Sequence, residues 1–221
     1  MELMEAIRSR HSVRQYTDKP IEAETIAALQ DEIDACNRES GLHIQLVTDE
    51  PDAFSSFMAH YGKFRGVKNY IALIGKKSDV LDELCGYYGE HLVLRAQQLG
   101  LNTCWVALTY KKIHSAFQVN SDEKLAAVIT LGYGENQGTT HKSKSAGAVS
   151  KSAGEAPDWF LSGVEAALLA PTAMNQQKFT LSYAGGKVSA KAGLGFFSKV
   201  DLGIVKYHFE IGSGMDHSIW N

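Results

Sequence analysis

The residues best suited to chemistry at the start of the chain are cations grouped around small hydroxyls. Three arginines, one histidine and two serines fall between positions 8 and 14. In an extended chain Arg10, Ser12 and Arg14 point to the same side, because side chains alternate. Two guanidinium groups around a hydroxyl suit a phosphate, whose oxygens match the paired donors of arginine. The alternative interpretation is a solvated helix end, where arginine complements the helix dipole.

Two further short elements could serve the same ligand. Lys142 and Lys144 follow a glycine-rich turn at 132–134 and share a face if extended, so they could converge on one phosphate with the first group. A solvated loop is the alternative. Residues 170–177 place Pro171 and small side chains before the amide of Asn175. Small side chains let the backbone approach a flat ligand, and an amide both donates and accepts at its edge. An ordinary helix-stop loop is the alternative here.

Composition excludes several classes of function. The chain has 221 residues, 44% of them hydrophobic, and a formal net charge of -3. This suits one domain or two small ones and disfavours a nucleic-acid binder, which usually carries a basic excess. No apolar run approaches a membrane span. The three cysteines lack a CxxC pair, so we expect reduced thiols in a cytoplasmic protein. We find no Walker sequence, dinucleotide fingerprint or metal-ligand spacing, and expect no metal.

Hydrophobic periodicity predicts the elements that must position these residues. We expect helices over 22–37, 80–99, 158–170 and 200–211, and shorter ones over 2–9, 51–61 and 111–117. Strands are expected over 43–48, 66–75, 102–109, 123–131, 179–183 and 187–192. Asp158 is expected to cap its helix, and the Ser- and Gly-rich segment 136–157 to be a polar connector. Trp105 lies in an expected buried strand, where a core aromatic is the simpler interpretation.

The order helix, strand, strand, helix occurs twice, over 22–99 and again over 158–211. Residue identity between the two copies is poor, so the likeness is architectural. It predicts a first half at 1–135, the connector at 136–157 and a shorter second half at 158–221.

Together the motifs resemble the FMN-dependent nitroreductase family, in a divergent branch similar to the nitroreductases of the Thermotoga type. Four separate pieces carry the resemblance: Arg10-His11-Ser12-Val13-Arg14, Gly100-Leu101-Asn102-Thr103-Cys104-Trp105, Leu131-Gly132-Tyr133-Gly134 with Lys142-x-Lys144, and Ala170-Pro171-Thr172-Ala173-Met174-Asn175-x-Gln177. The chain departs from the family in two ways. The last motif falls in the second half of the chain, and Lys178 and Phe179 stand where the family usually has Pro-Trp.

The resemblance implies an α+β fold, with a central mostly antiparallel sheet flanked by helices. It also implies FMN at a site that ordinary members build from two subunits. Here one chain carries both contributions, so we expect a single chain that resembles the family dimer, with a homodimer as the alternative. The implied cofactor-binding residues are Arg10, His11, Ser12, Arg14, Trp105, Val106, Ala107, Lys142, Lys144, Pro171, Thr172, Ala173, Met174 and Asn175.

The function implied is an FMN-dependent oxidoreductase of the nitroreductase or flavin reductase type. It would reduce nitro compounds, quinones or similar acceptors with NAD(P)H. The chemistry would lie on the flavin, so no catalytic side chain is expected. The alternative is a non-catalytic or degenerate flavin-binding protein. The expected partners are NAD(P)H and a small electron acceptor, without nucleic acid or membrane.

Overall fold

The computed structural model describes residues 1–221, apart from the side chains at positions 58 and 60. The chain divides into two compact units. We call residues 10–81 and 91–139 the large-sheet unit, and residues 1–9, 82–90 and 140–221 the small-sheet unit. Both units thus draw on the first 135 residues, and the division predicted from the repeated element order stays a prediction.

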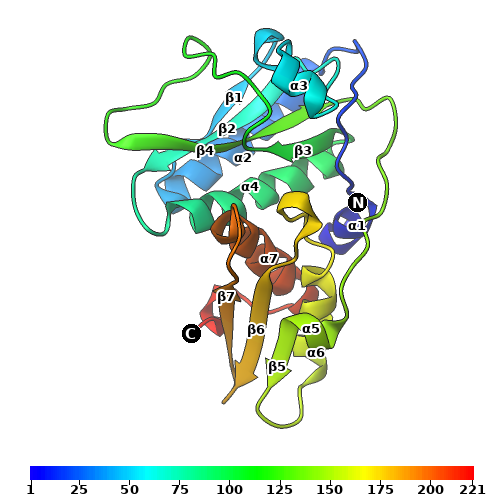
Figure 1. The fold of residues 1–221 in the computed structure, drawn as a ribbon, viewed down its shortest axis with the longest axis vertical. Helices are drawn as coiled ribbons and strands as arrows, with labels where there is room; N and C mark the ends of the chain where they lie inside the picture. Colours follow the sequence, from blue (N-terminus) through cyan, green and yellow to red (C-terminus); the bar gives the residue numbers. More distant parts are fainter. The chain divides into compact units, whose positions relative to one another are not determined.

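The large-sheet unit is built on a four-stranded antiparallel sheet in the order β1-β2-β4-β3 (Figure 1). The strands are β1 (Gln45–Val47), β2 (Asn69–Lys76), β3 (Asn102–Val106) and β4 (Glu123–Gly132). The helical elements are α2 (Ala23–Ser40), η1 (Asp52–Phe54), α3 (Phe57–Tyr61) and the second half of α4 (Leu81–Gln98). In Figure 1, α2 and α4 lie on one side of this sheet and α3 on the other.

Strand β2 is buried on both faces, as its nearly continuous apolar run predicts. Tyr70, Ala72 and Ile74 belong to a core cluster that also contains residues of η1 and α3. Ile71 and Leu73 alternate with them, so they face the other side of the sheet, and both are fully buried.

The helix α2 runs to Ser40, past its predicted end at residue 37, and Gly41 terminates it. Leu29, Ile33 and Cys36 are buried at helical spacing and form its inner face. Gly41 then takes a left-handed conformation, with φ of 71°, and its N–H donates to the carbonyl of Asn37 at 2.9 Å. Glycine tolerates this conformation, and the bond satisfies one of the last helix carbonyls.

The small-sheet unit has three strands in the order β5-β6-β7. They are β5 (Ser150–Ser152), β6 (Phe179–Ala184) and β7 (Lys187–Ala192), and the predicted β6–β7 hairpin is present around residues 185–186. Its helical elements are α1 (Leu3–Ser9), the first half of α4, α5 (Ala146–Val149), α6 (Asp158–Ala167), η2 (Ala173–Asn175), α7 (Ser198–Ser213) and η3 (His217–Ile219). In the part of the chain that the structure describes, no helix is long and apolar enough to cross a membrane.

Three predictions about local structure are wrong. Residues 111–117 form an irregular segment with one turn at 114–116 instead of a helix. The Phe117 side chain is buried in the core without helical structure around it. The predicted connector contains α5 and β5, and β5 pairs in parallel with β6 although its Ser-Lys-Ser sequence carries no apolar pattern. Asp158 is the first residue of α6, and Pro157 occupies the N-cap position.

Candidate functional site

The basic stretch runs beside the edge strand β3 in the large-sheet unit. Ser12 forms a parallel bridge with Thr103, and the N–H of Val13 donates to the Thr103 carbonyl at 2.9 Å. Tyr16 ties the other end, because its hydroxyl donates to the Val13 carbonyl at 2.7 Å and lies 2.8 Å from the Thr130 hydroxyl. These contacts hold the stretch close to β3 and fix which side chains turn inward.

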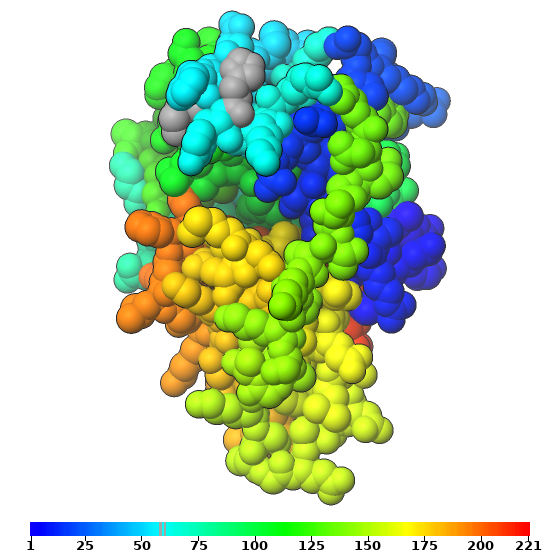
Figure 2. Space-filling model, turned by 45° about the vertical axis from the view of Figure 1, so that its right-hand side comes forward, coloured from blue at the N-terminus to red at the C-terminus, as the bar shows by residue number. Residues whose placement is uncertain are grey.

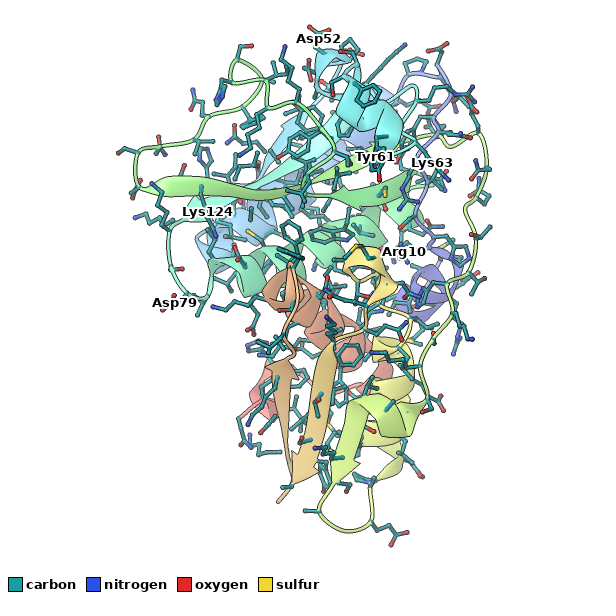
Figure 3. The ribbon with its side chains drawn as sticks, viewed as in Figure 1. Arg10, Asp52, Tyr61, Lys63, Asp79 and Lys124 are labelled. Atoms are coloured by element: carbon teal, nitrogen blue, oxygen red, sulfur yellow. The ribbon has the colours of Figure 1, made fainter. Side chains whose placement is uncertain are left out.

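Arg10, Ser12 and Arg14, three of the residues predicted to bind phosphate, lie near enough to Cys104 to affect its thiol. Burial raises the pKa of this thiol, and the nearby charges of Arg14 and Arg10 and a hydrogen bond with Ser12 lower it again in part. The two arginines differ in exposure: Arg10, labelled in Figure 3, is 4% exposed, whereas Arg14 is exposed. Arg14 is therefore the cation that solvent or a ligand reaches most easily.

The segment after β4 packs directly on the basic stretch. Gly138 has a φ of 71°, and a Cβ placed on it would lie 2.7 Å from the Cβ of His11 and 3.0 Å from the Ser12 carbonyl oxygen. The N–H of Gly134 donates to the side-chain oxygen of Asn102 at 2.9 Å. Backbone therefore approaches backbone here, and His11 is held half-buried beneath this segment.

The predicted residues of β3 divide between its two faces. Cys104 and Val106 belong to the hydrophobic core cluster, so the Val106 side chain is buried. Trp105 is half-buried and points the opposite way, because neighbours in a strand alternate. Ala107 follows the end of β3 and is also half-buried. The Trp105 side chain thus points away from the Cys104 thiol.

In the small-sheet unit, the predicted lysines and the predicted amide loop lie together. Gln177, only 2% exposed, joins them. Its side-chain nitrogen donates to the Lys142 carbonyl and to the Asn175 side-chain oxygen, each at 2.8 Å, and its oxygen accepts from the Lys144 N–H at 2.8 Å. The Asn175 amide also donates to the Lys142 carbonyl, at 2.9 Å. One buried amide therefore fixes the loop against the segment that carries both lysines.

The two lysines have different roles in this arrangement. The Lys144 ammonium donates to the carbonyls of Gln176 and Gln177, at 2.9 and 2.8 Å, so most of its donor capacity is used internally. The Lys142 side chain is exposed, and within the described residues its ammonium makes no hydrogen bond or ion pair. Lys142 is therefore the lysine of this pair that can meet an anion.

The amide loop, residues 171–177, has an unusual backbone. Met174, Asn175 and Gln177 have φ values of 51°, 53° and 45°, in the left-handed region that favours glycine. Such conformations cost about 1–3 kcal/mol each and cluster at functional sites. Thr172 helps to hold them, because its carbonyl accepts from the Asn175 N–H and its hydroxyl from the Gln177 N–H. Pro171, Thr172 and Ala173 are half-buried, while Asn175 is exposed.

Asp201 is a site residue that the sequence analysis missed. It lies in the first turn of α7, 3% exposed. One carboxylate oxygen accepts from the Ala173 N–H at 2.9 Å, and the other accepts from the Gln176 side chain at 2.7 Å. A single aspartate inside an expected helix gives no signal of this contact. Gln177, by contrast, was visible as part of the Asn175-x-Gln177 motif.

Asp201 predicts a pH-dependent stability. Burial raises the pKa of its carboxyl, although the hydrogen bonds from Gln176 and Ala173 oppose the shift. An acid whose folded-state pKa is raised contributes most stability below its ordinary pKa, about 3.9, and loses it as pH rises through the raised value. The stability advantage of the wild type over Asp201→Asn should therefore shrink from about pH 3.5 to pH 7. Urea unfolding of both proteins across this range measures it, and a constant difference would contradict the assignment.

Comparison with known proteins identifies the class. The structure is similar to a protein of Thermotoga maritima described as a "putative nitroreductase", with 24% identity, a TM-score of 0.66, and coverage of 96% of this chain and 83% of that one. It is also similar to a "putative nitroreductase in complex with FMN" from Desulfovibrio desulfuricans, with 19% identity, a TM-score of 0.54, and coverage of 71% and 98%. These likenesses establish an α+β nitroreductase-like fold, which confirms the predicted fold class.

The family follows from the sequence itself. The family model described as "Putative TM nitroreductase" matches residues 2–213, nearly the whole chain, so the protein belongs to this family. The predicted family is thereby confirmed. A comparison with curated proteins finds no match.

Proposed function

We propose that this protein binds FMN and uses it to transfer electrons from NAD(P)H to a nitro compound, a quinone or a similar small acceptor. Family membership supports an oxidoreductase, and the relative from Desulfovibrio desulfuricans is described in complex with FMN. A relative from Parabacteroides distasonis, at 23% identity, is described as a putative NADH dehydrogenase/NAD(P)H nitroreductase. FMN, when bound, supplies the electron-transfer chemistry itself.

The observation that carries the proposal is that the segment holding Arg10, Ser12 and Arg14 is paired with β3, through the Ser12–Thr103 bridge and the bond from the Val13 N–H to the Thr103 carbonyl. Two guanidinium groups and a hydroxyl form a donor set that suits a phosphate monoester, so these residues fit the end of FMN that distinguishes it from riboflavin. Because Arg10 is almost fully buried, its charge acts in a medium of low dielectric constant. In our proposal this group binds the phosphate and the ribityl chain, with His11 beside them.

The amide loop, considered by itself, has features that suit the flat ring of a flavin. Its side chains at positions 171–173 are small, and the Asn175 side chain is exposed at the loop surface. The left-handed residues and the bonds to Gln177 and Asp201 keep the loop in one shape before a ligand arrives, which lowers the entropy cost of binding. We propose that residues 171–175 contact the isoalloxazine ring and that Lys142 contributes positive charge. Trp105, Val106 and Ala107 stay candidates for the ring, Val106 through its backbone.

Arg14→Gln should separate phosphate recognition from ring recognition. A charge-assisted hydrogen bond contributes about 1.5–3 kcal/mol, so the Kd for FMN should rise about ten- to a hundredfold. The Kd for riboflavin, which lacks the phosphate, should change less than about twofold. Titration of flavin-free protein, followed by quenching of flavin fluorescence, measures both constants. Arg14 is preferable to Arg10 because it is exposed, so its replacement disturbs the core less.

Arg38→Gln is the matched control, since Arg38 is an exposed arginine of α2 in the same unit. It should leave both flavin affinities unchanged. Equal losses for FMN and riboflavin in Arg14→Gln, or an equal loss in Arg38→Gln, would contradict the phosphate assignment. Protein that binds neither flavin would refute the proposed function as a whole.

A non-catalytic flavin binder is the second candidate, because Lys178 and Phe179 replace the usual Pro-Trp and the loop lies in the second half of the chain. Turnover separates the two candidates. Flavin-loaded protein that oxidises NADH or NADPH only when a nitroaromatic acceptor is present is an enzyme, whereas yellow protein without turnover is a binder. The FMN content per chain, measured with the molar mass in solution, tests the expected single-chain arrangement against a homodimer.

A further inference from the structure

Three large apolar side chains of the small-sheet unit are almost fully exposed. Met174 lies in the amide loop and is 85% exposed, while Leu194 and Phe196 lie in the loop between β7 and α7 and are 95% and 78% exposed. We call these three residues the apolar patch. Isolated exposed apolar residues are ordinary, but three on adjoining loops make this surface a candidate binding site.

The two loops that carry the patch are joined by direct contacts. The Gln176 side chain donates to the Phe196 carbonyl at 2.9 Å, and the N–H of Gly193 donates to the Lys178 carbonyl at 2.7 Å. A Cβ placed on Gly195 would lie only 2.4 Å from the Gln176 side-chain oxygen. Figure 2 shows the two segments, yellow and orange, at the surface. Because Gln176 also donates to the buried Asp201, the backbone beneath the patch is fixed in place.

A lysine, Lys178, borders the patch. A Cβ on Gly195 would lie 3.1 Å from the Cδ of Lys178, so the aliphatic stem of Lys178 runs along the loop that carries Leu194. Among the described residues, the Lys178 ammonium makes neither a hydrogen bond nor an ion pair. The carboxylate of Asp201, which contacts the amide loop, is buried and uses both oxygens on loop donors. The surface therefore combines apolar contact area with the positive charge of Lys178.

We propose that the apolar patch and Lys178 bind the electron acceptor, and that they select planar aromatic acceptors carrying an anionic group, such as a nitrobenzoate. A Phe ring stacks on an aromatic ring, and a Met thioether also makes favourable contacts with one. The Lys178 ammonium pairs with a carboxylate at the rim of the ring. Met174 belongs to the loop segment 171–175 that we assign to the flavin ring, so an acceptor bound at the patch would lie next to the electron donor. This inference rests on the proposed function.

Two acceptors that share a ring and differ in charge test the selection. The carboxylate 4-nitrobenzoate and its neutral relative 4-nitrobenzamide share the nitroaromatic ring, so they differ at the group that Lys178 would recognise. With FMN-loaded protein and saturating NADPH or NADH, KM for 4-nitrobenzoate should be at least fivefold lower than for the amide. Lys178→Gln should bring the two KM values together by raising the first. Phe196→Ser should raise both KM values about tenfold and change kcat little.

Lys151→Gln is the control, because Lys151 is an exposed lysine of β5 in the same unit and should leave both KM values unchanged. The FMN Kd of every variant is measured alongside, and it should not change. Equilibrium dialysis of 4-nitrobenzoate and 4-nitrobenzamide against the protein, with and without FMN, distinguishes failure of the surface from failure of the proposed function. Binding that prefers 4-nitrobenzoate and is lost in Lys178→Gln would support acceptor binding at this surface, even if the protein shows no turnover.

Two results would overturn the inference. The first is equal affinity of the wild type for the carboxylate and the amide. The second is a change in molar mass, by light scattering, between the wild type and Phe196→Ser with both acceptor affinities intact, because the patch would then bind a second copy of this chain.

Discussion

Replacing Gly203 by valine should unfold the small-sheet unit or lower its free energy of unfolding by about 3 kcal/mol or more. A Cβ at this position of α7 would lie 2.0 Å from the Glu83 carbonyl oxygen and 2.6 Å from the Tyr87 nitrogen, both in the backbone of α4. A Cβ on Gly86 would likewise lie 2.0 Å from the Val200 carbonyl oxygen. The two helices therefore touch backbone to backbone, and no side-chain rotation can relieve the clash.

Urea unfolding followed by circular dichroism measures this loss, with Gly147→Ala as the control. Gly147 lies in α5 of the same unit, and a Cβ there would meet no atom within 4 Å. Its replacement by alanine, a better helix former, should leave stability equal or slightly higher. A Gly203→Val protein as stable as the wild type would show that α4 and α7 are not packed as described.

Glu90→Leu should destabilise the protein by about 3–5 kcal/mol, the usual cost of breaking a buried pair by removing one partner. Glu90 and His208 are both fully buried, and the His208 Nε2 lies 2.9 Å from a carboxylate oxygen of Glu90. The other ring nitrogen, Nδ1, lies 3.1 Å from the Ala166 carbonyl and must donate to it, because a carbonyl oxygen only accepts. The imidazole therefore bridges the Ala166 carbonyl and the Glu90 carboxyl group, and losing Glu90 leaves a polar ring edge in an apolar core.

The double variant Glu90→Leu with His208→Leu tests whether the two residues are energetically coupled. When both partners become apolar, no polar atom of the pair stays buried without a partner, so much of the lost stability should return. The Ala166 carbonyl keeps a bond from the Leu169 N–H, at 3.0 Å. Glu165→Leu, at an exposed position of α6, is the control and should change the unfolding free energy by less than about 0.5 kcal/mol. Additive losses in the double variant would contradict the coupling.

These contacts matter for the candidate site because they fix the helix that supports it. Asp201 stands in the first turn of α7, two residues before Gly203, and holds the amide loop through Ala173 and Gln176. A variant that loosens α7 should therefore also weaken any ligand bound at the loop.

The sequence by itself determined the local elements with strong patterns. The buried run of β2, the amphipathic face of α2 with its terminal Gly41, and the hairpin at residues 185–186 are all present. Each depends on a short-range rule, either side-chain period or the conformational freedom of glycine, which acts over a few neighbouring residues. The four motifs also identified the family, which the match over residues 2–213 confirms.

Only the tertiary structure decided the features that depend on partners distant in sequence. Phe117 is buried without a helix because the core cluster accepts it from an irregular segment, and the polar β5 is a strand because β6 offers it a free edge. Asp201 is a site residue because the position of α7 places its carboxylate against the amide loop. The basic stretch at positions 10–14 was recognisable in the sequence, but its pairing with β3 and the burial of Arg10 were not, because both depend on a strand distant in sequence.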